Sequence, residues 1–263
     1  MLTVLALMSL SAVPQTLPEF DRILLPVVTR RPVAGAHNSI WETLVTIRNG
    51  SDESVVFFPV DCPLIPPTPE RFCAQAFGTQ LPPGLTQRLN LFVPDGRVSP
   101  IFLNVTKSVA DRVFVQVRVH DLSRQSENFG TEIPVIRASE MKTTRGEILD
   151  IPRDPRFRLT FRLYADKVEH ASDLVVRFVN EATNGHREMH FSILPIPAEV
   201  SPDEPITTPP LYREITDFDS FGELSDAQRV RIEIEPQTTG IRYWAFVSVT
   251  NNETQQITTL SVH

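Results

Sequence analysis

The chain has 263 residues, of which 41% are hydrophobic and 22% charged, and its formal net charge is −7. This composition is typical of a soluble globular protein and argues against a disordered chain or a bundle of membrane-spanning helices. The acidic balance gives no electrostatic reason for binding phosphate backbones or anionic lipid, so we expect no nucleic-acid partner. The length suits one large domain or two of ordinary size.

The chain begins MLTVLALMSLSAVPQT, an apolar run over residues 2–10 followed by small residues. The run is rich in Leu and Met and far shorter than the ~20 residues that a membrane span needs. The pattern favours a cleavable signal peptide, although no Lys or Arg precedes it. We expect residues 1–19 to be a signal peptide or a disordered N-terminus, and the mature protein to be secreted or periplasmic with no membrane span after signal removal. A buried N-terminal strand is the alternative.

Alternation of apolar and polar residues recurs along the chain. After RILLPVV comes a strand–turn–strand segment, IWETLVTIRNGSDESVVFFPV, and then RVFVQVRVHD, in which four valines point to one face. RFRLTFRLY and RVRIEIE repeat this alternation. A period of two is typical of strands with one buried face, and a slip of one residue would bury the arginines. The sequence predicts an all-β fold.

The segments follow a similar order in the two halves. The order RILLPVV, then IWETLVTIRNGSDESVVFFPV, resembles the order TEIPVIR, EILDIP, FRLTFRLYAD and DLVVRFVNE in the second half. DRVFVQVRVHDLSRQSENFGTEIPV likewise resembles IRYWAFVSVTNNETQQITTLSV. We predict two tandem antiparallel β-sandwich domains, residues 20–128 and 129–263, that are diverged copies of one another. No Pro- or Gly-rich linker marks the junction, so we expect the domains to pack together. Chance similarity between two unrelated sandwiches is the alternative.

Residues 61–84 form a long proline-rich insertion that contains both cysteines, Cys62 and Cys73. Ten residues separate the cysteines. In an exported chain we expect them to form a disulfide, which stabilises such a loop by about 3 kcal/mol in the chain-entropy model. Two unpaired core thiols are the alternative. Residues 195–210 form a second proline-rich stretch, which is also acidic.

Long loops in compact domains are often functional, and proline lowers the entropy lost when a loop binds a partner. In the first loop, the predicted contact residues for a protein or a cell-surface glycan are Pro66, Pro67, Phe72 and Phe77. Alternatively, the loop covers an open end of the sandwich and its phenylalanines lie in the core. Trp244 and Phe246 lie on a strand with two apolar faces, which predicts either a contact surface or an interface between domains.

LVTIRNGSDESVVF has the strand, Asn/Gly/Ser turn, strand pattern of immunoglobulin-like modules in exported bacterial proteins. The chain as a whole resembles uncharacterised secreted bacterial proteins with tandem immunoglobulin-like β-sandwich domains. The resemblance rests on Trp41, Thr43, Leu44, Asn49 and the IPV at 133–135. It implies two immunoglobulin-like sandwiches and no particular activity.

Three segments invite a chemical interpretation. HREMH at 186–190 has the wrong order for a zinc helix, and on a strand its histidines lie ~13 Å apart, so charged cross-strand pairs are favoured. DFDSFGE at 217–223 resembles a calcium loop but has Phe221 and Gln228 at ligand positions, which favours a turn. DIPRDPRFR at 150–158 is either an anion clamp or a row of surface ion pairs. We predict no catalytic, cofactor-binding or metal-ligating residue.

The sequence therefore favours an exported non-enzymatic binding, adhesion or envelope-assembly module whose partner is a protein or a cell-surface glycan. The alternative is a carbohydrate-binding or accessory domain of an exported enzyme system, because sandwiches often present aromatic rings to sugars. A hydrolase without a recognisable local motif is a third possibility.

Overall fold

The computed structural model describes residues 19–60, 78–91, 93, 97–124, 129–166, 171–193, 210–216, 218 and 220–263. Residues 1–18, Cys62, Cys73 and the predicted contact residues Pro66, Pro67, Phe72 and Phe77 lie outside these ranges. The signal peptide, the disulfide and the loop contact therefore stay predictions.

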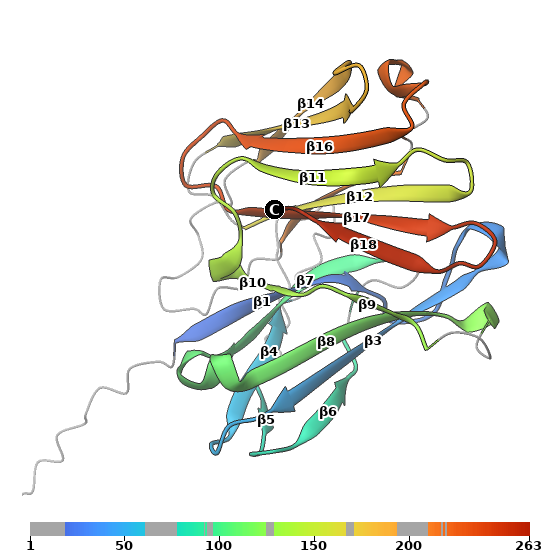
Figure 1. Cartoon of the computed structure of the whole chain (residues 1–263). Coiled ribbons are helices and arrows are strands. Elements are labelled where there is room, and N and C mark those ends of the chain that lie inside the picture. The colour runs from blue at the N-terminus through green and yellow to red at the C-terminus, as the bar shows by residue number, and fades with distance from the viewer. Residues whose placement is uncertain are drawn as a thin grey trace, which may run out of the picture.

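The described chain is built from antiparallel strands and short 3-10 turns, which confirms the all-β prediction (Figure 1). Sheet A contains, in spatial order, β10 (Ile136–Arg137), β1 (Phe20–Val28), β7 (Ser99–Thr106), β4 (Val55–Val60) and β5 (Thr79–Leu81). Sheet B contains β2 (Val33–Ala34), β3 (Ile40–Asn49), β8 (Val113–Asp121) and β9 (Thr131–Ile133), with β6 (Thr86–Leu89) also paired to β3. Sheets A and B face each other as the first sandwich.

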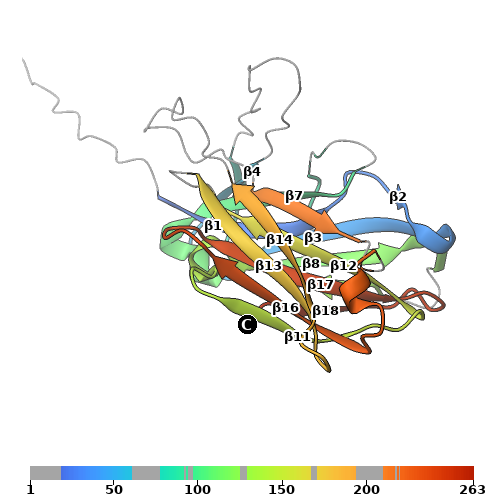
Figure 2. The same ribbon diagram turned by 90° about the horizontal axis from the view of Figure 1, so that it is seen from above.

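The second sandwich consists of sheets C and D. Sheet D contains β11 (Gly146–Pro152), β16 (Arg229–Pro236), β13 (Ser172–Asn180) and β14 (His186–Ile193). Sheet C contains β15 (Leu211–Ile215), β12 (Phe157–Ala165), β17 (Tyr243–Asn251) and β18 (Ile257–Ser261). From above, the strands of sheet D cross β1 and β3 obliquely (Figure 2). One continuous hydrophobic cluster runs through both sandwiches.

Both sandwiches have the same strand order. The order β1-β7-β4-β5 facing β6-β3-β8-β9 recurs as β11-β16-β13-β14 facing β15-β12-β17-β18. His263 also bonds to Glu147 of β11, in the place where β10 bonds to β1. Even the break in register recurs, between Leu25 and Val28 in β1 and between Ile148 and Ile151 in β11. This correspondence supports the predicted duplication.

The matching strand orders show that one part of the predicted repeat was wrong. TEIPVIR, expected to open the second copy, forms β9 and β10, which pair with β8 and β1 of the first sandwich. Its counterpart is the C-terminal segment ITTLSVH, as the second sequence match predicted, and the counterpart of β1 is β11. The predicted boundary at 128/129 thus separates β9 and β10 from their sheets. In constant-type immunoglobulin domains the first two strands are neighbours in one sheet, whereas here β11 and β12 lie in different sheets.

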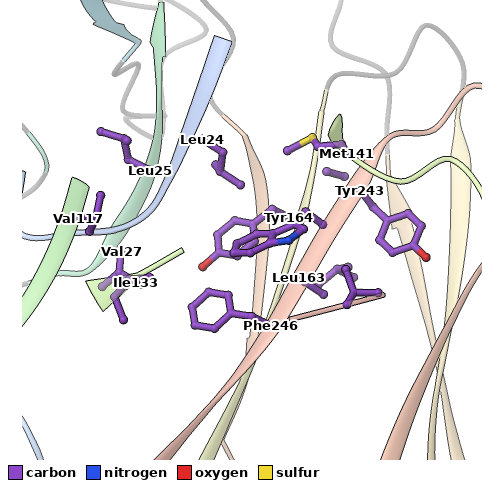
Figure 3. Close-up of a cluster of buried hydrophobic side chains, with 14 of the residues drawn as sticks. Leu24, Leu25, Val27, Val117, Ile133, Met141, Leu163, Tyr164, Tyr243 and Phe246 are labelled. Carbon is purple, nitrogen blue, oxygen red and sulfur yellow. The ribbon is translucent and has the colours of Figure 1, made fainter. Parts of the chain in front are cut away.

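The outer face of sheet C is covered by the first sandwich. Trp244 is only 4% exposed and Phe246 is fully buried, so these rings form an internal interface and no free contact surface. Tyr164 stacks on both rings and donates a hydrogen bond of 3.0 Å to the carbonyl oxygen of Pro26 in β1. Figure 3 shows Tyr164 and Phe246 between Val27 and Ile133 on one side and Leu163 on the other. The predicted packing of the two units rests on this contact.

The outer face of sheet D has a different character from that of sheet A. Leu24 and Phe102, paired neighbours on β1 and β7, are fully buried. Their counterparts on β11 and β16 are Glu147 and Glu233, which are also paired with each other. Arg145 forms ion pairs with both glutamates. The same position is therefore apolar in the first sandwich and charged in the second.

Candidate functional site

One pocket opens at the same place in each sandwich because an edge strand covers only half of its neighbour. β6 pairs with residues 45–48 of β3, and β15 pairs with residues 161–165 of β12. The first half of β3 and of β12 is therefore not paired with that edge strand. It lies instead beside the segment that follows β1 or β11. Both of these connections, which contribute lining residues to the two pockets, lie on the right-hand side of Figure 1.

The first pocket has a volume of about 340 Å³ and a largely polar lining. Its described lining residues are Thr29, Arg30, Glu42, Thr43, Leu44, Arg88, Leu89, Asn90 and Leu91. The backbone N–H of Thr43 donates to the hydroxyl of Thr29 at 3.0 Å. The side-chain hydroxyl of Thr43 is itself buried and has no hydrogen-bond partner, and the residue is only 9% exposed. The pocket therefore contains a polar group whose bonding capacity is unused.

The second pocket has a volume of about 460 Å³. Its described lining residues are Pro152, Arg153, Asp154, Pro155, Phe157, Arg158, Leu159, Thr216, Phe218, Ser225, Ala227 and Asn252. Arg158 donates to the side-chain oxygens of Asn252, at 3.2 Å, and Gln255. Arg153 donates to the carbonyl oxygen of Leu224 at 3.4 Å. The lining thus brings two guanidinium groups to one cavity.

The only carboxylate among those lining residues, that of Asp154, is held by Arg156. The Arg156 guanidinium donates to both carboxylate oxygens of Asp154, and the Arg156 backbone N–H adds another hydrogen bond. These bonds lower the pKa of Asp154 to about 2. Burial lowers the pKa of Arg158, and Asp121 of the first sandwich partly offsets this effect. Asp154 is therefore ionised at neutral pH, and Arg156 balances its charge.

The pockets share a sequence signature that the sequence analysis missed. Arg30 follows β1 in VTRRP, and Arg153 follows β11 in IPRDP, so an R-x-P motif leaves each first strand at the same point beyond the bulge. Asn90 and Thr216 are likewise equivalent, because each directly follows the residue that ends β6 or β15. The repeated R-x-P was the signal that could have identified Arg30.

The structure tests the other chemical interpretations of the sequence at the residues that it describes. In DIPRDPRFR, Asp150 pairs with Arg229 and Asp154 with Arg156, so surface ion pairs are present, yet two other arginines of the segment line the pocket. In HREMH, Glu188 of β14 pairs with Arg177 of β13 at 2.6 Å, which confirms the cross-strand interpretation. Asp217 and Asp219 of the calcium-like segment lie outside the described residues.

The described residues contain no cluster of three or more His, Cys, Asp or Glu side chains placed to hold a metal ion. Nor do those residues form any helix with the length and apolarity to cross a bilayer. The chain matches no protein-family model, no curated protein and no solved structure, so its function has to be argued from the pockets themselves.

Proposed function

We propose that the chain is an exported, non-enzymatic binding module that recognises its ligand with these two pockets. The observation that carries this proposal is the repetition of one arginine-lined pocket at the same place in both sandwiches. Core packing does not require a polar cavity, and still less the same one twice. Guanidinium, hydroxyl and amide groups around a cavity are typical of ligand recognition.

The interface between the sandwiches supports this role because it holds the two pockets in a fixed relation. Arg22 and Asp166 form a buried ion pair across it, and Arg242 also pairs with Asp166. Adhesion and envelope assembly both need such a rigid module, whose partner is a surface protein or a cell-surface glycan. The resemblance to secreted bacterial proteins with immunoglobulin-like domains agrees with this proposal.

Photo-crosslinking in cells of the source organism tests the proposal. A photoreactive residue replaces Asn90 in the first pocket or Ser225 in the second, and the control replaces His190 on the outer face of sheet D. We expect one recurrent adduct from both pocket positions and none from the control. Adducts that are equally abundant from His190, or absent from both pockets, would contradict a recognition role for the pockets.

Export is tested separately by the N-terminus of the purified protein. Mass spectrometry should find a chain that begins after the apolar run at residues 2–10. An intact Met1 in the mature protein would overturn the export proposal and would leave the pockets unaffected.

The alternative function is that of a carbohydrate-binding accessory domain. The exposed rings of Phe114 and Phe129 favour it, because Phe129 is 81% exposed and Phe114 is 60% exposed. A sugar that stacks on these rings should raise the melting temperature of the wild type but not of Phe129→Ala. If both proteins respond equally, the sugar binds elsewhere.

A further inference from the structure

We propose that Asn184 is a site of self-modification, at which the chain converts its own asparagine side chain into aspartate or isoaspartate through a cyclic imide. The turn between β13 and β14 carries the pair Asn184 and Gly185, and Arg231 of β16 activates the amide that reacts. This inference is independent of the proposed function, because it involves neither pocket.

The turn exposes the side chain of Asn184 to water. The backbone N–H of Asn184 donates to the carbonyl oxygen of Asn180 at 2.9 Å, and the N–H of Asn180 donates to the carbonyl oxygen of Gly185 at 2.8 Å. These two bonds close the hairpin, and residues 181–184 between them are all exposed. Gly185 has no side chain that would shield its own nitrogen, so another group can approach this nitrogen closely.

Two hydrogen bonds from one guanidinium group reach the amide oxygen of Asn184. Nη1 and Nη2 of Arg231 each lie 3.4 Å from Oδ1 of Asn184. Nε of the same guanidinium donates to Glu233 at 3.0 Å, which holds the group in this orientation. When a nucleophile attacks the amide carbon, negative charge develops on this oxygen, and donors already in place lower the barrier. Arg231 therefore polarises the carbonyl group that has to react.

The nucleophile is the backbone nitrogen of Gly185. Its N–H donates to the hydroxyl oxygen of Thr183 at 3.2 Å, which makes the nitrogen more electron-rich. Attack forms a bond between this nitrogen and Cγ of Asn184, and the side-chain nitrogen leaves as ammonia with the proton that the Gly185 nitrogen loses. Water then opens the imide ring at either of its two carbonyl carbons, which gives aspartate or isoaspartate. Each event adds one negative charge to the chain.

The sequence contains a second Asn–Gly pair, at residues 49–50, which provides an internal comparison. Asn49 is fully buried. Its side-chain nitrogen donates to the carbonyl oxygens of Glu53 at 2.7 Å and Leu81 at 2.9 Å. These bonds hold the leaving group in place, and burial keeps away the water that opens the imide. The fold therefore protects Asn49 and leaves Asn184 reactive.

Peptide mass spectrometry of the full chain, incubated at neutral pH and sampled over time, tests the inference. We expect aspartate and isoaspartate to accumulate at residue 184 and not at residue 49. In urea both pairs lose their surroundings and should react at similar rates. A folded protein in which residue 49 reacts as fast as residue 184 would contradict the site.

Arg231→Gln tests the role of the guanidinium group. In the folded protein it should slow the reaction at Asn184 by about two- to fivefold, the effect of losing a partly exposed charged contact, and in urea it should have no effect. Arg145→Gln is the matched control. It makes the same charge change beside the same glutamate, Glu233, but the ion pairs of Arg145 are with Glu147 and Glu233 and not with Asn184.

Thr183→Val is a second variant, on the exposed turn, for the case that Arg231→Gln does not fold. It removes the hydroxyl that accepts from Gly185 and should slow the reaction by a similar factor. A rate at Asn184 that neither variant lowers, or that Arg145→Gln lowers as much, would overturn the inference.

Discussion

Arg22 in β1 and Asp166, which directly follows β12, form an ion pair across the two sandwiches, with 2.6 Å between Nη1 and Oδ1. Both side chains are buried, and the guanidinium of Arg22 also lies 3.8 Å from the centre of the Phe102 ring. Removal of one partner of a buried ion pair is strongly destabilising. The pair therefore connects the stability of one sandwich to that of the other.

We expect Asp166→Asn to lower the free energy of unfolding by about 3–5 kcal/mol, because it removes the buried carboxylate that pairs with both Arg22 and Arg242. Urea denaturation followed by fluorescence measures this change. Asp154→Asn is the matched control, since its partner Arg156 is mostly exposed, and should cost less than about 1 kcal/mol. Equal effects of the two substitutions would show that the buried pair is no stronger than a surface pair.

The aromatic interface between the sandwiches predicts a small loss of stability for one substitution and a large loss for another. Tyr164→Phe removes the hydrogen bond to Pro26 and should cost about 1 kcal/mol. Trp244→Ala removes a buried ring from the same stack and should cost about 3–5 kcal/mol. Urea denaturation again gives both values. A negligible effect of Trp244→Ala would mean that the two sandwiches pack independently of this stack.

The tyrosines predict a loss of stability in alkali. The chain has three tyrosines, Tyr164, Tyr212 and Tyr243, and burial raises the pKa of each phenol above its ordinary value. A raised folded pKa contributes stability that is fully present below about pH 10, the unfolded pKa, and is lost as the pH rises above it. Tyrosinate absorbance should therefore appear together with unfolding. A normal titration near pH 10 in the folded protein would contradict the burial.

The buried hydroxyl of Thr43, which has no hydrogen-bond partner, predicts that its removal does not destabilise the fold. Thr43→Val keeps the side-chain volume and removes a buried group without a partner, so stability should stay equal or rise by about 1 kcal/mol. Thermal unfolding of the two proteins measures this change. A strongly destabilised variant would show that the hydroxyl has a structural partner.

The pairing of β9 and β10 predicts where the first sandwich can be cut. A chain that ends at residue 128 lacks both strands, whereas one that ends at residue 140 keeps their pairing with β8 and β1. The longer chain should be the more stable, and hydrogen exchange should protect Ile133 in it. Both chains expose part of the interface with sheet C, so self-association has to be measured alongside. Equal stability would show that β9 and β10 contribute little.

Local alternation was sufficient to predict the strands, because the period of two is a property of each segment by itself. In β8, Val113, Val117 and Val119 are buried and Phe114 is exposed, as the pattern indicates. TEIPVIR was misplaced in the repeat because a short apolar run carries no information about its partner strand. β9 pairs with β8, the long strand just before it, whereas β10 pairs with β1, more than a hundred positions earlier in the chain.

The pockets were harder to predict because they arise from an offset between strands. No local pattern reveals that β6 begins opposite Arg48 and ends opposite Val45, which leaves Thr43 uncovered. The anion clamp considered for the segment 150–158 included Arg153 and Arg158, which line the second pocket, but surface ion pairs were the preferred interpretation. Arg30 was not considered, although its R-x-P motif repeats in the sequence.

The charged outer face of sheet D has a consequence for how far this architecture can extend. The first sandwich covers the outer face of sheet C, and a further sandwich that covered the outer face of sheet D in the same way would extend the chain like the units of a repeat protein. Glu147 and Glu233 occupy the positions where Leu24 and Phe102 are buried, and so this face resists a further sandwich. The second sandwich thus ends the molecule with a polar face. In a double variant with Glu147→Leu and Glu233→Phe this face becomes apolar, and the protein should associate with further copies without limit.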